Sequence, residues 1–188
     1  MPPIPVLSDD DRFVDPIDML EAEPPDAVDR VVEVAGMVAV FAAERLLSIA
    51  HLQADARRRG PGMSTEIRDR SVRLELASAL RITEYAAGEL LALADAVVHR
   101  FPVVYDSLHQ GQITERHAQI LTSIVDTVEL SHRGAVLERG LALALEHPVG
   151  TFRRLLSSLV ETIRAATLDE RYAESLSHRR VVIEAADE

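Results

Sequence analysis

Residues 26–61 read DAVDRVVEVAGMVAVFAAERLLSIAHLQADARRRGP. Apolar residues recur in this stretch at steps of three and four, which is the period of an α-helix. Asp26 can cap the first turn, and the arginines at 57–59 suit the negative end of the helix dipole. Gly60 and Pro61 supply a stop signal. The stretch therefore predicts one helix of about thirty residues, which is long for a globular protein.

The middle of this predicted helix, residues 34–43, contains no polar side chain. Ten residues are too few to cross a bilayer, which takes about twenty. A helix that is apolar on most of its circumference has to be surrounded by other protein. We expect the rest of the domain to surround it, and the alternative is a dimer seam with a second copy.

The chain after residue 61 predicts further helices over 65–80, 84–100, 114–130 and 131–146, and from Pro148 onward. A short segment at about 102–110 precedes Gly111. The sequence of residues 167–170, TLDE, matches a capping box and predicts a new helix start. The expected fold is all-α, a multi-helix bundle led by one long N-terminal helix. The β-branched run at 181–183 favours a short β-strand at the C-terminus, so we expect 179–188 to begin a truncated strand region.

The charge of the chain is unevenly distributed. The formal net charge is −11, and the first 29 residues hold nine acidic residues, one basic residue and six of the nine prolines. We expect residues 1–25 to form an acidic, flexible arm. This arm is either a solvated tail or a segment that competes with nucleic acid for a basic face. It lacks the features of a secretory signal, so we expect a cytoplasmic protein.

The sequence offers little catalytic chemistry. It contains no cysteine, and no two of its seven histidines have the i, i+4 spacing of a helical zinc site. The nucleophile elbow, the P-loop and the dinucleotide fingerprint are also missing. We therefore expect no cofactor, no metal, no small-molecule substrate and no enzymatic activity.

Residues 74–94 have the skeleton of a helix-turn-helix, with two apolar-spaced helices around a tight turn. The expected outer face of the second helix carries Glu84, Tyr85, Glu89 and Asp95, and acidic side chains repel phosphate. Ordinary bundle packing is therefore the favoured interpretation of this segment.

The segments 74–94 and 107–118 together resemble the actinobacterial family DUF222, also called the 13E12 repeat family. The family hallmark is a Leu, Gly and Ile group followed by His-Ala, matched here by Leu108, Gly111, Ile113, His117 and Ala118. TFRRLL at 151–156 and RRVV at 179–182 are similar to later parts of the family pattern. The resemblance covers roughly residues 30–185, so we place the helical domain at 26–178.

The resemblance implies a limited function. Family members typically carry an HNH endonuclease module after this helical part, and that module needs a metal-bound His-Asn-His set. The present sequence contains no Asn and ends where the strand region is expected, so the nuclease module is expected to be absent. What remains is a non-catalytic helical domain of a nuclease-associated protein, which assists DNA association or holds two copies together as a self-association module.

Individual residues can be assigned provisional roles. Arg153, Arg154, Arg179 and Arg180 are the candidate nucleic-acid contacts, and the alternative is that such arginines are solvated partners of nearby acids. His117 lies on the apolar stripe of its helix and is expected to be a buried, hydrogen-bonded histidine. Gly111 is expected to supply the backbone freedom for the turn before Ile113.

Overall fold

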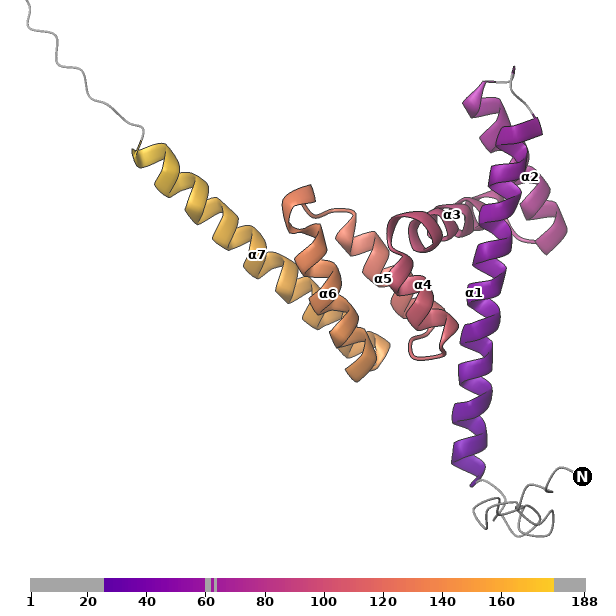
Figure 1. The fold of residues 1–188 in the computed structure, drawn as a ribbon, viewed down its shortest axis with the longest axis horizontal. Coiled ribbons are helices and arrows are strands. Elements are labelled where there is room, and N and C mark those ends of the chain that lie inside the picture. The colour runs from indigo at the N-terminus through magenta and orange to yellow at the C-terminus, as the bar shows by residue number, and fades with distance from the viewer. Residues whose placement is uncertain (1–25, 60–61, 63, 178–188) are drawn as a thin grey trace, which may run out of the picture. The chain divides into compact units, whose positions relative to one another are not determined.

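The computed structural model describes residues 26–59, 62 and 64–177, with side chains described up to residue 166. Its elements are helical throughout these ranges, in agreement with the predicted all-α class (Figure 1). They are α1 (Ala27–Arg59), α2 (Thr65–Leu80), α3 (Glu84–Asp95), η1 (Ala96–Arg100), α4 (Pro102–His109), α5 (Glu115–Val125), α6 (Leu130–Glu146) and α7 (Val149–Ser177). The expected arm at 1–25 and the expected strand at 179–188 lie outside the described residues.

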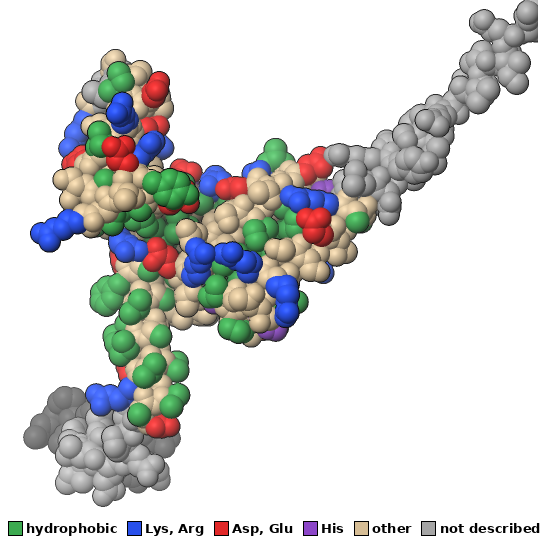
Figure 2. Space-filling model, turned by 180° about the vertical axis from the view of Figure 1, so that it is seen from behind, with side chains coloured by type: hydrophobic (Ala, Val, Ile, Leu, Met, Phe, Trp, Pro, Cys, Tyr) green, Lys and Arg blue, Asp and Glu red, His purple; other side chains and the backbone are tan. Residues whose placement is uncertain are grey.

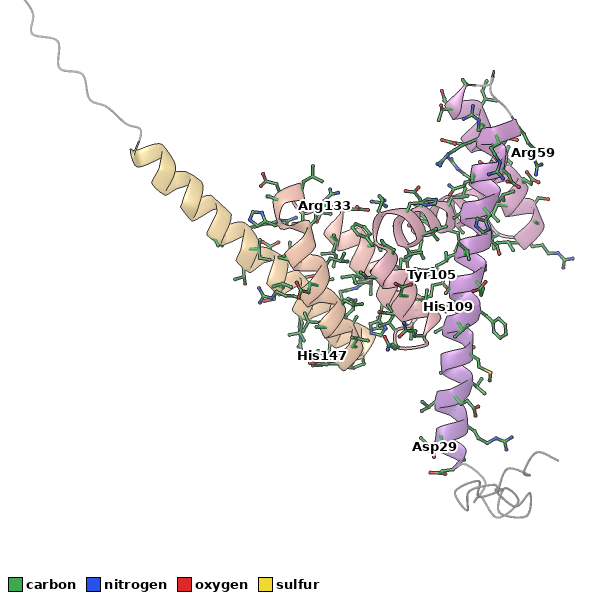
Figure 3. All side chains as sticks on the ribbon, viewed as in Figure 1. Asp29, Arg59, Tyr105, His109, Arg133 and His147 are labelled. Atoms are coloured by element: carbon green, nitrogen blue, oxygen red, sulfur yellow. The ribbon has the colours of Figure 1, made fainter. Side chains whose placement is uncertain are left out.

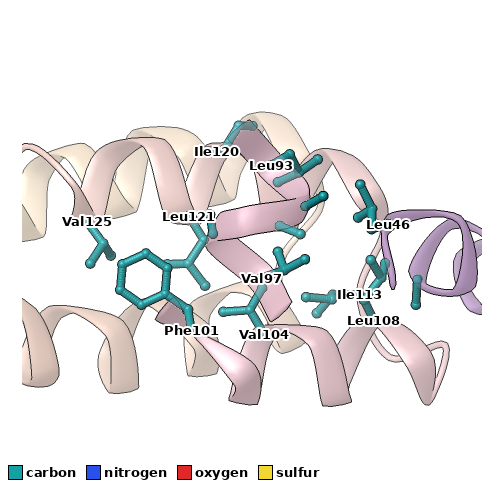
Figure 4. Close-up of a cluster of buried hydrophobic side chains, with 14 of the residues drawn as sticks. Leu46, Leu93, Val97, Phe101, Val104, Leu108, Ile113, Ile120, Leu121 and Val125 are labelled. Atoms are coloured by element: carbon teal, nitrogen blue, oxygen red, sulfur yellow. The ribbon is translucent and has the colours of Figure 1, made fainter. Parts of the chain in front are cut away.

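The chain divides into two units, residues 1–34 and residues 35–188. The described part of the first unit consists of the opening turns of α1. The second unit contains the hydrophobic core, to which every helix contributes. Figure 4 shows its centre, where Leu46 of α1 lies near Val97, Val104 and Leu108, with Leu121 of α5 beside Phe101. Burial of such side chains is the main force that assembles these helices.

The helix starts follow local rules. Ser64, Thr83 and Thr114 stand before α2, α3 and α5, and the side-chain oxygen of each accepts a hydrogen bond from a backbone N–H in the first turn. α2 ends at Arg81, whose φ of 55° is left-handed. This left-handed residue makes the tight turn that lets α3 fold back against α2.

Three boundaries differ from the expectation. The predicted helix over 84–100 changes at Ala96 into the π-helical turn η1, which closes with a 2.8 Å hydrogen bond from Phe101 N–H to Ala96 O. The predicted helix over 114–130 ends at Val125. Ser131 does not cap α6, which is preceded by Glu129. The guanidinium of Arg133 instead donates to the carbonyls of Asp126 and Val128 in the connection, at 2.8 Å each.

The capping box predicted at 167–170 is wrong as a helix start. α7 continues without a break from Val149 to Ser177. A capping-box sequence inside a helix keeps helical hydrogen bonds when its backbone N–H groups already have partners one turn earlier.

None of the described helices combines the length and the apolar character that a membrane crossing requires.

A close approach between helices occurs at Gly140 of α6. A Cβ atom at this position would lie 2.7 Å from Leu121 Cδ1 and 2.9 Å from Leu156 Cδ1. Both leucines are fully buried, so neither can move aside cheaply. The missing side chain thus allows α6 to pack directly on α5 and α7.

We expect Gly140→Ala to lower the free energy of unfolding by about 1–3 kcal/mol, because the added methyl overpacks the core. The measurement is urea denaturation followed by circular dichroism. Gly134→Ala is the matched control on the same helix, since a Cβ there meets nothing within 4 Å. It should be neutral or stabilise by up to about 1 kcal/mol through helix propensity. Equal losses in both variants would contradict the close-packing argument.

Candidate functional site

The residues that carry the family hallmark surround the turn between α4 and α5. Leu108, Ile113 and Ala118 are buried, with 0%, 2% and 0% of their surface exposed. Gly111 has a φ of 72°, which L-residues rarely adopt. A Cβ at Gly111 would also lie 3.2 Å from the Cα of Gly36. The hallmark glycine therefore serves both the turn and the close contact with α1.

His117 is buried and uses both ring nitrogens. Its Nδ1 lies 2.8 Å from Thr114 Oγ1 and 3.3 Å from Thr114 N, and its Nε2 lies 3.0 Å from the carbonyl oxygen of His147. Because a carbonyl only accepts, Nε2 carries the proton and Nδ1 accepts from Thr114. The ring also packs against Phe152, with centroids 5.2 Å apart. His117 thus joins the start of α5 to the α6–α7 turn, where Figure 3 labels His147.

The connection between α1 and the α4–α5 turn is polar. Arg45 Nη2 donates to both carboxylate oxygens of Glu115 at 2.7 Å. Glu44 lies 2.9 Å from His109 Nε2 and 3.5 Å from the Tyr105 hydroxyl. Figure 3 shows Tyr105 and His109 together beside α1. Burial raises the pKa of the Tyr105 hydroxyl, and the negative charge of Glu44 raises it further.

A second polar cluster joins η1 to the end of α5. Arg100 donates to Asp126 and lies 3.3 Å from Asp95. The hydrogen bond with Asp126 raises the pKa of Arg100, as do the charges of both carboxylates, against the opposing effect of burial. Since arginine is charged at any physiological pH in any case, this cluster is a constant electrostatic tie without a titrating switch.

The candidate nucleic-acid residues are only partly described. Arg153 and Arg154 are exposed on α7, and neither makes a hydrogen bond or ion pair with another described residue. Arg164, in contrast, lies 2.9 Å from Glu161 and 3.2 Å from the Thr127 hydroxyl. Arg179 and Arg180 lie outside the described residues. On the face seen in Figure 2, basic and acidic side chains alternate without forming one basic surface.

The sequence interpretation missed an apolar surface on α1. Ala39, Ala42 and Ala43 are buried in the core, but the opposite side of the same turns is open. Met37, Val38 and Phe41 expose 46%, 63% and 71% of their surface. The expectation that the domain surrounds this stretch is wrong for that side, because the neighbouring helices cover only the alanine face. Figure 2 shows hydrophobic side chains along this helix.

An open groove begins beside this surface. Val38 of α1, Tyr85 and Leu90 of α3 and Gln119 of α5 are among its lining residues, and its volume is about 770 Å³. Tyr85 is 77% exposed. Together with Glu84 and Glu89, which are also exposed, it gives α3 an acidic and aromatic outer face. This face is unsuited to phosphate contact, as expected for bundle packing of the helix-turn-helix segment.

The part of the chain with described side chains contains no group of three or more histidine, aspartate or glutamate residues placed to hold a metal ion. Its geometry defines an all-α domain with a structural histidine at its centre and an exposed apolar helix face.

Comparison with known proteins agrees with that description. Residues 35–188 match the family model described as "Domain of unknown function (DUF222)", and the chain belongs to this family. No curated protein matches the chain, and no solved structure does so either.

We expect His117→Ala to lower the free energy of unfolding by about 2–3 kcal/mol. The change leaves the carbonyl of His147 without its donor and opens a cavity against Phe152. Chemical denaturation measures the loss, and His51→Ala on the exposed side of α1 is the control, expected within about 0.5 kcal/mol of the wild type. Wild-type stability in the His117 variant would rule out the proposed tie.

Proposed function

We propose that this chain is a non-catalytic association domain, and that two copies pair through the exposed face of α1. The observation that carries the proposal is a stripe of exposed apolar side chains, which we call the α1 stripe. Its members are Val31, Val34, Val38 and Phe41, with 68%, 53%, 63% and 71% of their surface exposed.

The spacing of the α1 stripe suits helix pairing. Its residues follow one another at steps of three, four and three, the alternation found in coiled coils. The steps are the same when counted from either end, so two antiparallel copies place Val31 opposite Phe41 and Val34 opposite Val38. A two-fold dimer needs this self-complementarity, because each contact occurs twice with the roles exchanged.

The exposed area also fits a dimer. Val28, Val32 and Met37 are further exposed residues of the same helix, at 65%, 65% and 46%. With the α1 stripe they present on the order of 700 Å² of surface, close to the roughly 800 Å² that each partner buries in a stable complex. Monomeric proteins rarely expose contiguous apolar patches of this size. A second copy would remove the stripe from water.

Mass measurement over a range of concentrations tests the pairing. We expect the wild type to sediment as a dimer and Val38→Glu/Phe41→Glu as a monomer with unchanged helical circular dichroism, since two carboxylates in the seam would be buried without partners. Leu130→Glu/Val103→Glu adds the same charge at exposed apolar positions of α6 and α4, and should remain a dimer. A wild type that stays monomeric at every concentration would refute the proposal.

DNA association is a second proposed function, as the non-catalytic part of a nuclease-associated protein. Two observations favour it: Arg153 and Arg154 are adjacent and exposed, and their charges are not neutralised by any described side chain. Such arginines are free to contact phosphate. The net charge of −11 opposes this association and limits it to low salt.

Fluorescence anisotropy with a labelled DNA duplex tests this second function. We expect Arg153→Gln/Arg154→Gln to weaken binding at low salt and to reduce its salt dependence by about two ions. Arg30→Gln/Arg116→Gln changes the net charge equally at other exposed positions and should bind like the wild type. Equal weakening in both variants would show a non-specific charge effect and contradict a contact at α7.

A further inference from the structure

A small polar cavity lies between the end of α1, α2 and α3. Its volume is about 150 Å³, and its polar lining residues are Gln53, Arg57, Arg68, Asp69 and Arg73. We call it the arginine cavity. None of these residues belongs to the α1 stripe or to the α7 arginines, so this site is separate from both proposed functions.

Two buried polar atoms of the arginine cavity have no hydrogen-bond partner within the protein. They are Arg73 Nε and Gln53 Oε1. The Arg73 side chain lies along α3 at Gly88, where a Cβ would be 3.7 Å from its Cδ and Nε atoms. A buried donor without an acceptor is costly, and such groups usually have a partner in the functional state of a protein. The Arg73 guanidinium therefore requires an acceptor in the cavity.

The charge around the cavity indicates what kind of acceptor is suitable. Three guanidinium groups and one carboxylate, that of Asp69, line it. Water can accept a hydrogen bond from Arg73, but water does not balance the excess positive charge. An oxyanion does both, and the planar guanidinium fork matches the oxygens of phosphate in pairs. A cavity of about 150 Å³ holds a molecule the size of benzene, so a phosphate group fits.

We propose that the arginine cavity binds a phosphate group, either as free phosphate or as a phosphodiester of a nucleic acid. Arg73 and Arg57 hold the phosphate oxygens from α2 and from the last turns of α1. Gln53 offers its amide N–H₂ as a further donor when its side-chain amide is oriented accordingly. Asp69 opposes the binding, because its carboxylate lies on the same lining.

Titration of the full chain with inorganic phosphate, followed by calorimetry at constant ionic strength, tests the site. We expect saturable binding by the wild type and about tenfold weaker binding by Arg73→Gln and by Arg57→Gln. Asp69→Asn should bind more tightly. Arg70→Gln, an exposed arginine on α2 outside the cavity lining, is the matched control and should bind like the wild type. Because Arg57 is exposed, its variant remains informative if Arg73→Gln does not fold.

The wild type failing to bind phosphate, or Arg70→Gln losing as much affinity as Arg57→Gln, would overturn the proposal. Competition then separates the two sources of the phosphate group. Displacement of inorganic phosphate by dimethyl phosphate and by a DNA duplex assigns the site to a phosphodiester, and displacement by neither assigns it to free phosphate. Dimerisation through the α1 stripe is measured independently, so either proposal can fail without the other.

Discussion

Helix α5 is packed against α4, α6 and α7, and the buried face of this helix holds the second unit together. Ile120, Leu121 and Val125 fill that face with at most 3% of their surface exposed. His117 adds direction to this non-specific burial, because its two nitrogens bind one partner before α5 and one before α7. The register of the bundle therefore follows from one satisfied imidazole among apolar contacts.

Helix α1 is used unequally on its two sides. The alanine side packs closely on the core and meets the hallmark turn where Gly111 approaches Gly36, a contact that larger side chains would prevent. The valine and phenylalanine side has no neighbour among the described residues of the second unit, and its exposure of 46–71% per side chain opposes monomeric stability in water. The same helix thus supplies both a core element and an unpartnered surface.

Charge has a different role in this chain. Most described ion pairs, such as Arg45 with Glu115, connect one element to another at the surface and contribute little individually. The arginines without such partners are more informative. Arg153 and Arg154 face solvent on α7, whereas Arg73 keeps a buried Nε without an acceptor beside a cavity.

The sequence by itself determined the helical class, the long first helix and the caps at Ser64, Thr83 and Thr114, because these depend on periodicity and on contacts within one turn. It also indicated a buried, hydrogen-bonded His117, since the histidine falls on an apolar stripe. The partner of His117 is thirty residues away, and the meeting of Gln53 with Arg73 joins two helices. The exposure of Phe41 depends on which side of α1 other helices cover. Only the tertiary structure decided these features, because local spacing carries no information about distant neighbours.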